Sequence, residues 1–164
     1  MQTIDTIIQT NRIGLDQSKA NELTEKLNDL LANFQIYYQN IRGFHWNIKG
    51  TDFFQLHIKF EELYTEAQNI IDELAERILA IGGVPKHSFS SYLNIAEIKE
   101  EKNVSDAKET VKGTLNALSI LIKKERAILK IAAEAEDEGT VALISEYIKN
   151  QEKETWMLSA WLGK

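Results

Sequence analysis

Residues 45–76 read HWNIKGTDFFQLHIKFEELYTEAQNIIDELAE and combine an apolar repeat with a set of possible metal ligands. From Phe53 to Ile81, apolar side chains recur at the spacing of an amphipathic helix, which predicts one long helix. The glycine pair at 82–83 and the nearby Pro85 predict where this helix ends. Because one face of such a helix must be buried, the rest of the chain has to supply elements that cover it.

Three further apolar stripes of the same kind predict three further long helices. One stripe covers residues 23–44, and two follow the quoted segment, over residues 111–129 and 141–162. Ser105 is placed to cap the third helix, and Gly139 is placed to interrupt it before the fourth. The sequence therefore predicts an all-α protein.

The connection between the second and third helices is unusually long. Residues 82–103 lose the apolar periodicity, so we expect them to cross the bundle and to hold a short helix near residues 94–100. Four long helices with one long crossover form a ferritin-like four-helix bundle, here with a short extra helix between helices two and three. We expect residues 1–164 to form a single domain, with residues 1–20 as a partly ordered N-terminal extension.

The composition is that of a folded, acidic protein. Of 164 residues, 43% are hydrophobic and 27% are charged, and there is no cysteine, so metal ligands have to come from His, Asp and Glu. The start lacks the features of a secretory signal, and no apolar run is long enough to span a membrane, which predicts a cytoplasmic protein. A formal net charge of -6 argues against broad non-specific binding to nucleic acid.

Four polar side chains on the second helix form a candidate site. At about 100° per residue, they share a face that points away from the apolar stripe. The four are His57, Glu61, Asp72 and Glu76. His57 and Asp72 are about 22 Å apart along a helix, so they cannot bind one ion together. A second copy packed antiparallel on this face would bring the histidine end of one chain to the carboxylate end of the other, twice by symmetry.

His45 can complete such a site. The turn at Gly50 can fold His45 back beside His57, which gives two imidazoles and up to three carboxylates, a set that suits a first-row transition metal such as iron. Spacing alone leaves a polar dimer interface as an equal alternative, since polar residues opposite an apolar stripe are usually solvated, and His45 alone could cap helical carbonyls. Glu73 and Arg77 are expected to form an i,i+4 surface pair.

Two motifs in this part of the chain match the pattern of a known family. HWNIKG at residues 45–50 is followed after five residues by Leu56-His57 and after three more by Glu61. IDELAER at residues 71–77 is followed by Gly82 and Pro85. Together these motifs resemble the signature of the Dps family of mini-ferritins, and the similarity in helix plan covers nearly the whole chain.

The resemblance implies a hollow homododecamer with dinuclear ferroxidase centres across its twofold interfaces. In such a centre His45, His57 and Glu61 would come from one subunit, and Asp72 and Glu76 from its neighbour, with Glu76 bridging the two metals. Many family members have Asp where this chain has Glu61. The longer side chain of Glu61 would weaken binding of the metal ion at the second, weaker position. The implied reaction is oxidation of Fe(II), preferably by hydrogen peroxide, with storage of Fe(III) mineral inside the shell and protection against oxidative damage.

The sequence lacks the motif of ordinary ferritins, which bind metal inside one subunit through Glu-x-x-His pairs. None of the three histidines has a glutamate three positions before it. His87, beside the Pro85 turn, is expected to be an exposed loop residue.

Two further implied roles each have an ordinary alternative. Trp46, beside His45, is a candidate radical trap, although packing at an interface is the more common role of such a residue. An acidic pore for iron entry is implied near the start of the last helix, but acidic residues there also stabilise the helix dipole without any pore. The candidate pore residues are Asp137, Glu138 and Glu146.

The name of the Dps family records DNA binding, usually through a lysine-rich extension. In residues 1–20 the basic side chains Arg12 and Lys19 are balanced by Asp5 and Asp16, so we expect DNA binding to be weak or absent. Two alternatives to iron oxidation remain. One is a DNA-binding, nucleoid-protecting protein with little ferroxidase role, and the other is a purely structural protein that assembles without binding metal.

Overall fold

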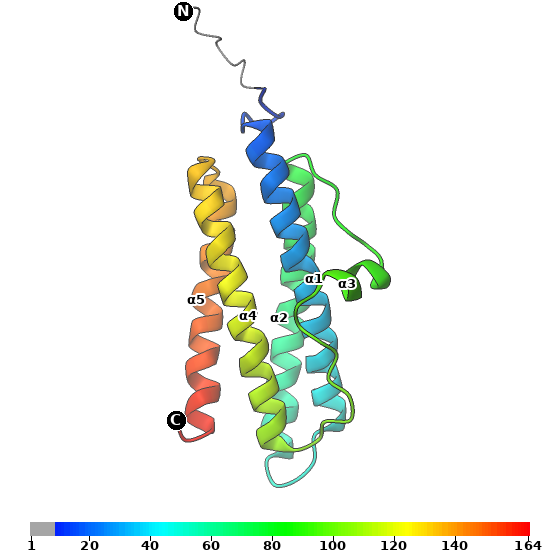
Figure 1. Ribbon diagram of the computed structural model, residues 1–164. Coiled ribbons are helices and arrows are strands. Elements are labelled where there is room, and N and C mark those ends of the chain that lie inside the picture. Colours follow the sequence, from blue (N-terminus) through cyan, green and yellow to red (C-terminus); the bar gives the residue numbers. More distant parts are fainter. Residues whose placement is uncertain (1–8) are drawn as a thin grey trace, which may run out of the picture.

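Four long helices and one short helix form the described part of the chain. The computed structural model describes residues 9–164. α1 packs against α2 and α4, and α4 packs against α5, so the long helices form one bundle (Figure 1). The predicted all-α, ferritin-like bundle with a short helix between the second and third long helices is confirmed. The helices are α1 (Gln17–Asn47), α2 (Phe53–Ala80), α3 (Phe89–Ile95), α4 (Ala107–Glu134) and α5 (Glu138–Trp161).

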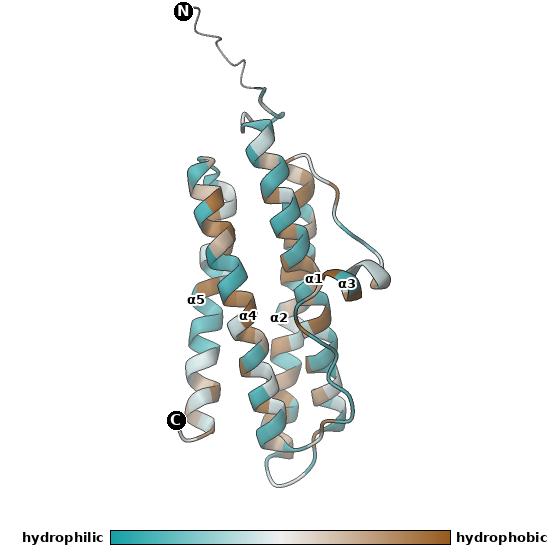
Figure 2. Ribbon diagram, in the orientation of Figure 1, coloured by the Kyte–Doolittle hydropathy of each residue, from teal (hydrophilic) through white to brown (hydrophobic). Residues whose placement is uncertain are grey.

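The core lies between the apolar stripes of the long helices. Figure 2 shows apolar and polar residues alternating around each of them. Phe34 of α1, Phe60 of α2 and Leu118 of α4 are fully buried. Since burying a side chain of this size contributes roughly 1.5–3 kcal/mol, the predicted stripes supply the main driving force for folding.

α4 begins one residue later than the sequence suggested. Asp106, and not the predicted Ser105, caps this helix by accepting a hydrogen bond from the Glu109 amide at 3.0 Å. The Ser105 carbonyl accepts a hydrogen bond from the Lys49 amide at 3.1 Å, which holds Ser105 in the preceding loop. The carboxylate of Asp106 is therefore the group that satisfies the free amides of the first turn.

The break between α4 and α5 also differs from the prediction. Gly139 lies in the first turn of α5, and the break falls at residues 135–137, where Glu136 has a φ of 55°. Asp137 caps α5 by accepting a hydrogen bond from the Thr140 amide at 3.1 Å. Because the chain reverses through a left-handed glutamate, the prediction that Gly139 interrupts the helix was wrong.

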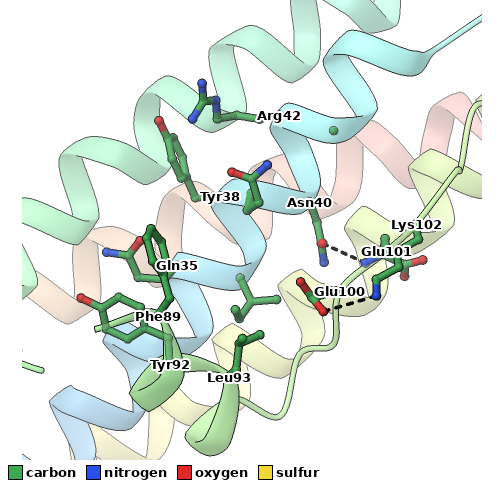
Figure 3. A pocket seen from close by; sticks show the side chains of 13 residues that line it. Gln35, Tyr38, Asn40, Arg42, Phe89, Tyr92, Leu93, Glu100, Glu101 and Lys102 are labelled. Carbon is green, nitrogen blue, oxygen red and sulfur yellow. Dashed lines mark hydrogen bonds and ion pairs between the residues drawn. The ribbon is translucent and has the colours of Figure 1, made fainter. Parts of the chain in front are cut away.

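Three asparagines of α1 hold the long connection against the bundle. The side-chain amides of Asn28 and Asn40 each donate one hydrogen bond to the backbone of the connection and accept one from it. The side chain of Asn33 instead accepts hydrogen bonds from two backbone amides of the connection. Figure 3 shows the contact made by Asn40. All three side chains are buried. The contacts join Asn28 to residues 84–86, Asn33 to residues 97–98 and Asn40 to residues 99–101.

The short helix α3 lies earlier in the connection than predicted. It begins after Ser88, whose side chain accepts a hydrogen bond from the Ser91 amide, and it ends at Ile95. The amides of residues 97 and 98 are bound to Asn33 at 3.0 Å each, so they are not available for a helix. The predicted position at residues 94–100 was therefore wrong, although the helix itself is present.

The first described residues pack at the end of the bundle. The Asn11 side chain donates a hydrogen bond to the Ile81 carbonyl at 2.9 Å. Asp16 caps α1 by accepting a hydrogen bond from the Lys19 amide at 2.9 Å. The last residues of the predicted extension, 17–20, thus belong to α1, whereas residues 1–8 lie outside the described part.

Candidate metal centre

His45, near the end of α1, and His57, near the start of α2, lie face to face. Their rings are stacked with centroids 3.8 Å apart and planes inclined by 16°. The Nδ1 atom of His45 lies 2.6 Å from the His57 carbonyl oxygen, and the Nδ1 atom of His57 lies 2.8 Å from the His45 carbonyl oxygen. Since a carbonyl oxygen can only accept, each Nδ1 carries a proton. Both Nε2 lone pairs are thereby left for a metal.

The chain between the two helices brings these histidines together. α1 ends at Asn47, and Gly50 adopts a φ of 107°, a conformation that glycine reaches without steric cost. Ile48 anchors the turn because its side chain is buried. The predicted folding of His45 back beside His57 is therefore confirmed.

Aromatic side chains enclose the histidine pair. The Phe53 ring stacks on His57 with centroids 4.9 Å apart and planes inclined by 19°. The Tyr64 ring meets His45 edge to face at 5.3 Å. His45 itself is only 8% exposed. These contacts fix both imidazole planes, which is what preorganised metal ligands require.

The three candidate carboxylates remain exposed on α2. Glu61 lies one turn beyond His57, whereas Asp72 and Glu76 lie toward the other end of the helix, about 22 Å from His57 in the case of Asp72. Within residues 9–164, no three His, Asp or Glu side chains lie close enough together to hold a metal ion. One chain thus presents a histidine half-site and, separately, a pair of carboxylates.

The same face of α2 also carries exposed apolar side chains. Phe54 is 78% exposed, Ile58 is 56% exposed and Leu79 is 58% exposed. At about 100° per residue, all three lie within the sector that holds the candidate ligands. Large apolar side chains that are exposed beside polar ones are typical of a protein–protein interface. This surface is the one that the sequence predicts to meet a second copy.

Trp46 lies at the edge of this surface. Its ring is 57% exposed and sits 4.7 Å from the Arg42 guanidinium, which also covers Tyr38 at 5.2 Å. Such cation–π contacts hold the indole in place. Arg42 and Tyr38 also line a groove of about 560 Å³ between α1 and α3, into which Figure 3 looks. Phe89, which also lines this groove, is 83% exposed.

Two residues that were expected to pair on the surface instead bind α5. Glu73 accepts a hydrogen bond from the Tyr147 hydroxyl at 2.7 Å, and Arg77 contacts Asp137 at 2.5 Å. The i,i+4 pair between Glu73 and Arg77 was therefore predicted wrongly. The sequence did not show that both side chains turn toward a helix sixty or more residues away.

The other predicted residues occupy different places on the surface. Asp137 is buried and already serves as the cap of α5 and the partner of Arg77. Glu138 and Glu146 are exposed, and Glu146 contacts Lys149. His87 is exposed in the connection, with Nδ1 3.0 Å from the Pro85 carbonyl oxygen.

Comparison with known proteins assigns the chain to a family. A family model described as a ferritin-like domain matches residues 24–164. A protein of Porphyromonas gingivalis named DNA protection during starvation protein is 47% identical over 151 residues, which cover 92% of this chain and 95% of that protein. The chain belongs to the Dps family.

Solved Dps structures have the same fold as this Dps chain. The Dps protein of Vibrio cholerae, described as a member of a broad superfamily of ferritin-like diiron-carboxylate proteins, is 54% identical. It matches with a TM-score of 0.92 over 93% of this chain and 96% of that one. The Dps protein of Bacillus brevis is 40% identical, with a TM-score of 0.86 over 88% of this chain and 97% of that one.

Membership of this family supports iron binding and an iron-storage role. The imidazole and carboxylate groups on α2 are a suitable donor set for iron. Among residues 9–164, no helix is both long and apolar enough to cross a membrane.

Proposed function

We propose that this Dps protein oxidises Fe(II), preferably with hydrogen peroxide, at dinuclear sites between subunits of a dodecameric shell. The Fe(III) product is stored as mineral inside the shell, which protects the cell from oxidative damage. The reciprocal hydrogen bonds of His45 and His57 carry this proposal, because they leave both Nε2 lone pairs free for a metal, while residues 9–164 of one chain do not complete a metal site. The absence of cysteine fits a cytoplasmic location.

Each site takes ligands from both chains. His45, His57 and Glu61 bind iron from one side, while Asp72 of the partner subunit and Glu76 of the partner subunit bind from the other. Two Fe(II) ions supply two electrons, which with two protons reduce one hydrogen peroxide to two waters. Because both electrons are transferred together, release of hydroxyl radical is limited. Trp46, close to His45 and exposed, is placed to donate an electron to any stray oxidant.

Mixed shells test whether the site is shared. We expect His57→Ala and the double variant Asp72→Ala/Glu76→Ala each to lose the fast phase of Fe(II) oxidation. If the two variants are unfolded, mixed in equal amounts and reassembled, half of the dimers contain one of each. Each mixed dimer has one intact site, so about one quarter of the wild-type sites should return.

The reassembled single variants are the controls, since neither can form an intact site. No recovery in the mixed shells would contradict sharing of ligands between chains. Unchanged kinetics in the double variant would remove Asp72 and Glu76 from the site. Replacing hydrogen peroxide by dioxygen in the same assay tests the oxidant preference.

The proposal includes weak or absent DNA binding. The described part of the N-terminal segment carries Arg12 and Lys19 against Asp16, which leaves little excess positive charge for contact with phosphates. Tight retention of plasmid DNA in a gel at low salt and neutral pH, without divalent metal, would contradict this part. Glu138 and Glu146, both exposed, remain the candidates for an iron pore, whereas Asp137 is engaged by Arg77.

A further inference from the structure

Polar side chains bridge α2 and α5 along the length of the bundle. Each bridge joins a donor on one helix to an acceptor on the other or at its cap. The bridges are Arg77 with Asp137, Tyr147 with Glu73 and Lys59 with Glu154. Between the last two, the pattern is interrupted by a group of acceptors.

A small cavity lies at this interruption. It has a volume of about 10 Å³, which is room for one water-sized occupant. Glu66 of α2, Gln151 and Glu154 of α5 and Tyr37 of α1 are among the residues that line it, together with apolar side chains. Three kinds of oxygen donor, carboxylate, amide and phenol, therefore surround one space inside a single chain.

Gln151 is the most informative residue of this cavity. Its side chain is 5% exposed, and its Nε2 atom donates a hydrogen bond to Oε1 of the buried Glu125 at 2.5 Å. The Oε1 atom of Gln151 is buried without any hydrogen-bond partner among residues 9–164. Because an unpaired buried acceptor costs free energy, a cation in the cavity would stabilise this oxygen.

The nearby lysine does not satisfy the remaining oxygens. The Lys59 ammonium donates to Oε1 of Glu154 at 2.9 Å and lies 2.8 Å from Oε2, which receives no well-directed hydrogen bond within the described chain. The same ammonium also contacts Glu62 at 3.3 Å. One positive charge is thus shared between two carboxylates, and it only partly offsets the burial of the Glu66 carboxylate.

We propose that this cavity binds one small divalent cation through the carboxylates of Glu66 and Glu154 and the amide oxygen of Gln151. Oxygen donors without histidine favour a hard cation of the Mn²⁺, Mg²⁺ or Fe²⁺ class over Zn²⁺ or Cu²⁺. The site is distinct from the shared centre on the exposed face of α2, because all its ligands come from one chain. It also differs from an internal ferritin centre, which uses Glu-x-x-His pairs.

The charge balance of the cluster agrees with a bound cation. Burial raises the pKa of Glu66, and the neighbouring charge of Glu154 raises that pKa further. Burial likewise raises the pKa of Tyr37, with added contributions from Glu66 and Glu154, so the phenol lies near both carboxylates. A divalent cation would lower the electrostatic cost of ionising these groups.

Crystals of the full-length shell soaked in MnCl₂ test the proposal directly. We expect an anomalous peak at the manganese edge within the cavity, between Glu66, Gln151 and Glu154. The peak should persist in the Asp72→Ala/Glu76→Ala double variant, which removes the proposed shared centre. Manganese peaks only at the subunit interface, or a cavity filled by water without anomalous signal, would overturn the proposal.

Two matched variants connect the peak to its ligands. In the Asp72→Ala/Glu76→Ala background, Glu66→Gln should lower the Mn²⁺ bound at equilibrium dialysis by about one ion per chain. Glu152→Gln, at an exposed position of α5 outside the cavity, should leave the stoichiometry unchanged. Equal Mn²⁺ binding by both variants would overturn the assignment of the ligands. If Glu66→Gln does not assemble, Glu154→Gln replaces it in the same measurement. The Asp72→Ala/Glu76→Ala variant should lose fast iron oxidation but keep the Mn²⁺ ion in the cavity. This combination distinguishes the cavity site from the shared centre.

Discussion

The side chain of His45 binds the backbone of His57, and the side chain of His57 binds the backbone of His45. These two hydrogen bonds, of 2.6 and 2.8 Å, connect the end of α1 to the start of α2. Neither imidazole can rotate without losing its bond to a carbonyl oxygen. The Nε2 edges of both rings, which we propose to bind iron, are therefore oriented before any metal arrives, which lowers the cost of binding.

Phe53 is expected to contribute to metal affinity without touching the metal. Its ring stacks on His57 at 4.9 Å, so Phe53→Leu leaves the imidazole less well held. A contact of this kind is worth about 0.5–1.5 kcal/mol, which predicts a loss of metal affinity of about two- to tenfold. Titration calorimetry with Zn²⁺ as a non-oxidising probe measures it. Phe89→Leu, at an exposed ring of α3, is the control, and equal affinities for both variants would contradict the role.

Ile58 is expected to be essential for pairing of the subunits. The side chain is 56% exposed in one chain, on the face that carries the candidate ligands. Ile58→Asp would place a charge in the proposed interface, where desolvation makes it unfavourable. We expect dissociation of the shell in light scattering and loss of fast iron oxidation together. Asn116→Asp adds the same charge to an exposed position of α4 and should affect neither; a fully assembled Ile58→Asp shell would exclude this face as the interface.

Asn33 is expected to be important for stability although it lies far from the proposed metal ligands. Its Oδ1 atom accepts hydrogen bonds from the amides of residues 97 and 98, at 3.0 Å each. Asn33→Ala would leave these amides without their partner, at a cost of about 1–3 kcal/mol. A lower Tm and faster hydrogen exchange at residues 97–98 are the expected results. Asn94→Ala, at an exposed position of α3, should change neither quantity.

The same asparagine shows why only part of the fold could be predicted. The long helices follow from apolar stripes, because periodic burial is visible within each segment itself. The position of α3 depends on hydrogen bonds from α1 to residues more than fifty positions away, which no local pattern reveals. Likewise, the proximity of His45 and His57 could be predicted from their spacing, whereas the exchange of hydrogen bonds depends on the backbone of the turn at Gly50.

Arg77 is expected to stabilise the start of α5. It contacts Asp137, whose side chain is 2% exposed and also caps the helix. Arg77→Met would leave this carboxylate buried without a counter-charge, which typically costs about 3–5 kcal/mol. The expected result is a clearly lower Tm in calorimetry. Arg126→Met removes an ion pair to Glu152 in which both side chains are more than half exposed, and it should cost at most about 1 kcal/mol.

Glu125 is expected to make stability fall as the pH rises. Burial raises the pKa of this glutamate to about 7, a shift that its hydrogen bond with Gln151 and the charge of Arg126 only partly oppose. The folded chain therefore retains a proton that the unfolded chain releases near pH 4.5, and stability decreases between these values as the pH increases.

Glu125→Gln keeps the shape and the acceptor for Gln151 but removes the ionisation. At pH 8 the variant should be more stable than the wild type, by on the order of 3 kcal/mol from the difference between the two pKa values. At pH 4 the two proteins should unfold alike, since Glu125 is then protonated in both states. Thermal unfolding between pH 4 and 8, with EDTA present to remove bound cations, measures the difference. Glu152→Gln, at an exposed glutamate of α5, should leave the dependence of stability on pH unchanged. If the stability of Glu125→Gln follows the pH in parallel with that of the wild type, ionisation of Glu125 has no cost and the prediction is contradicted.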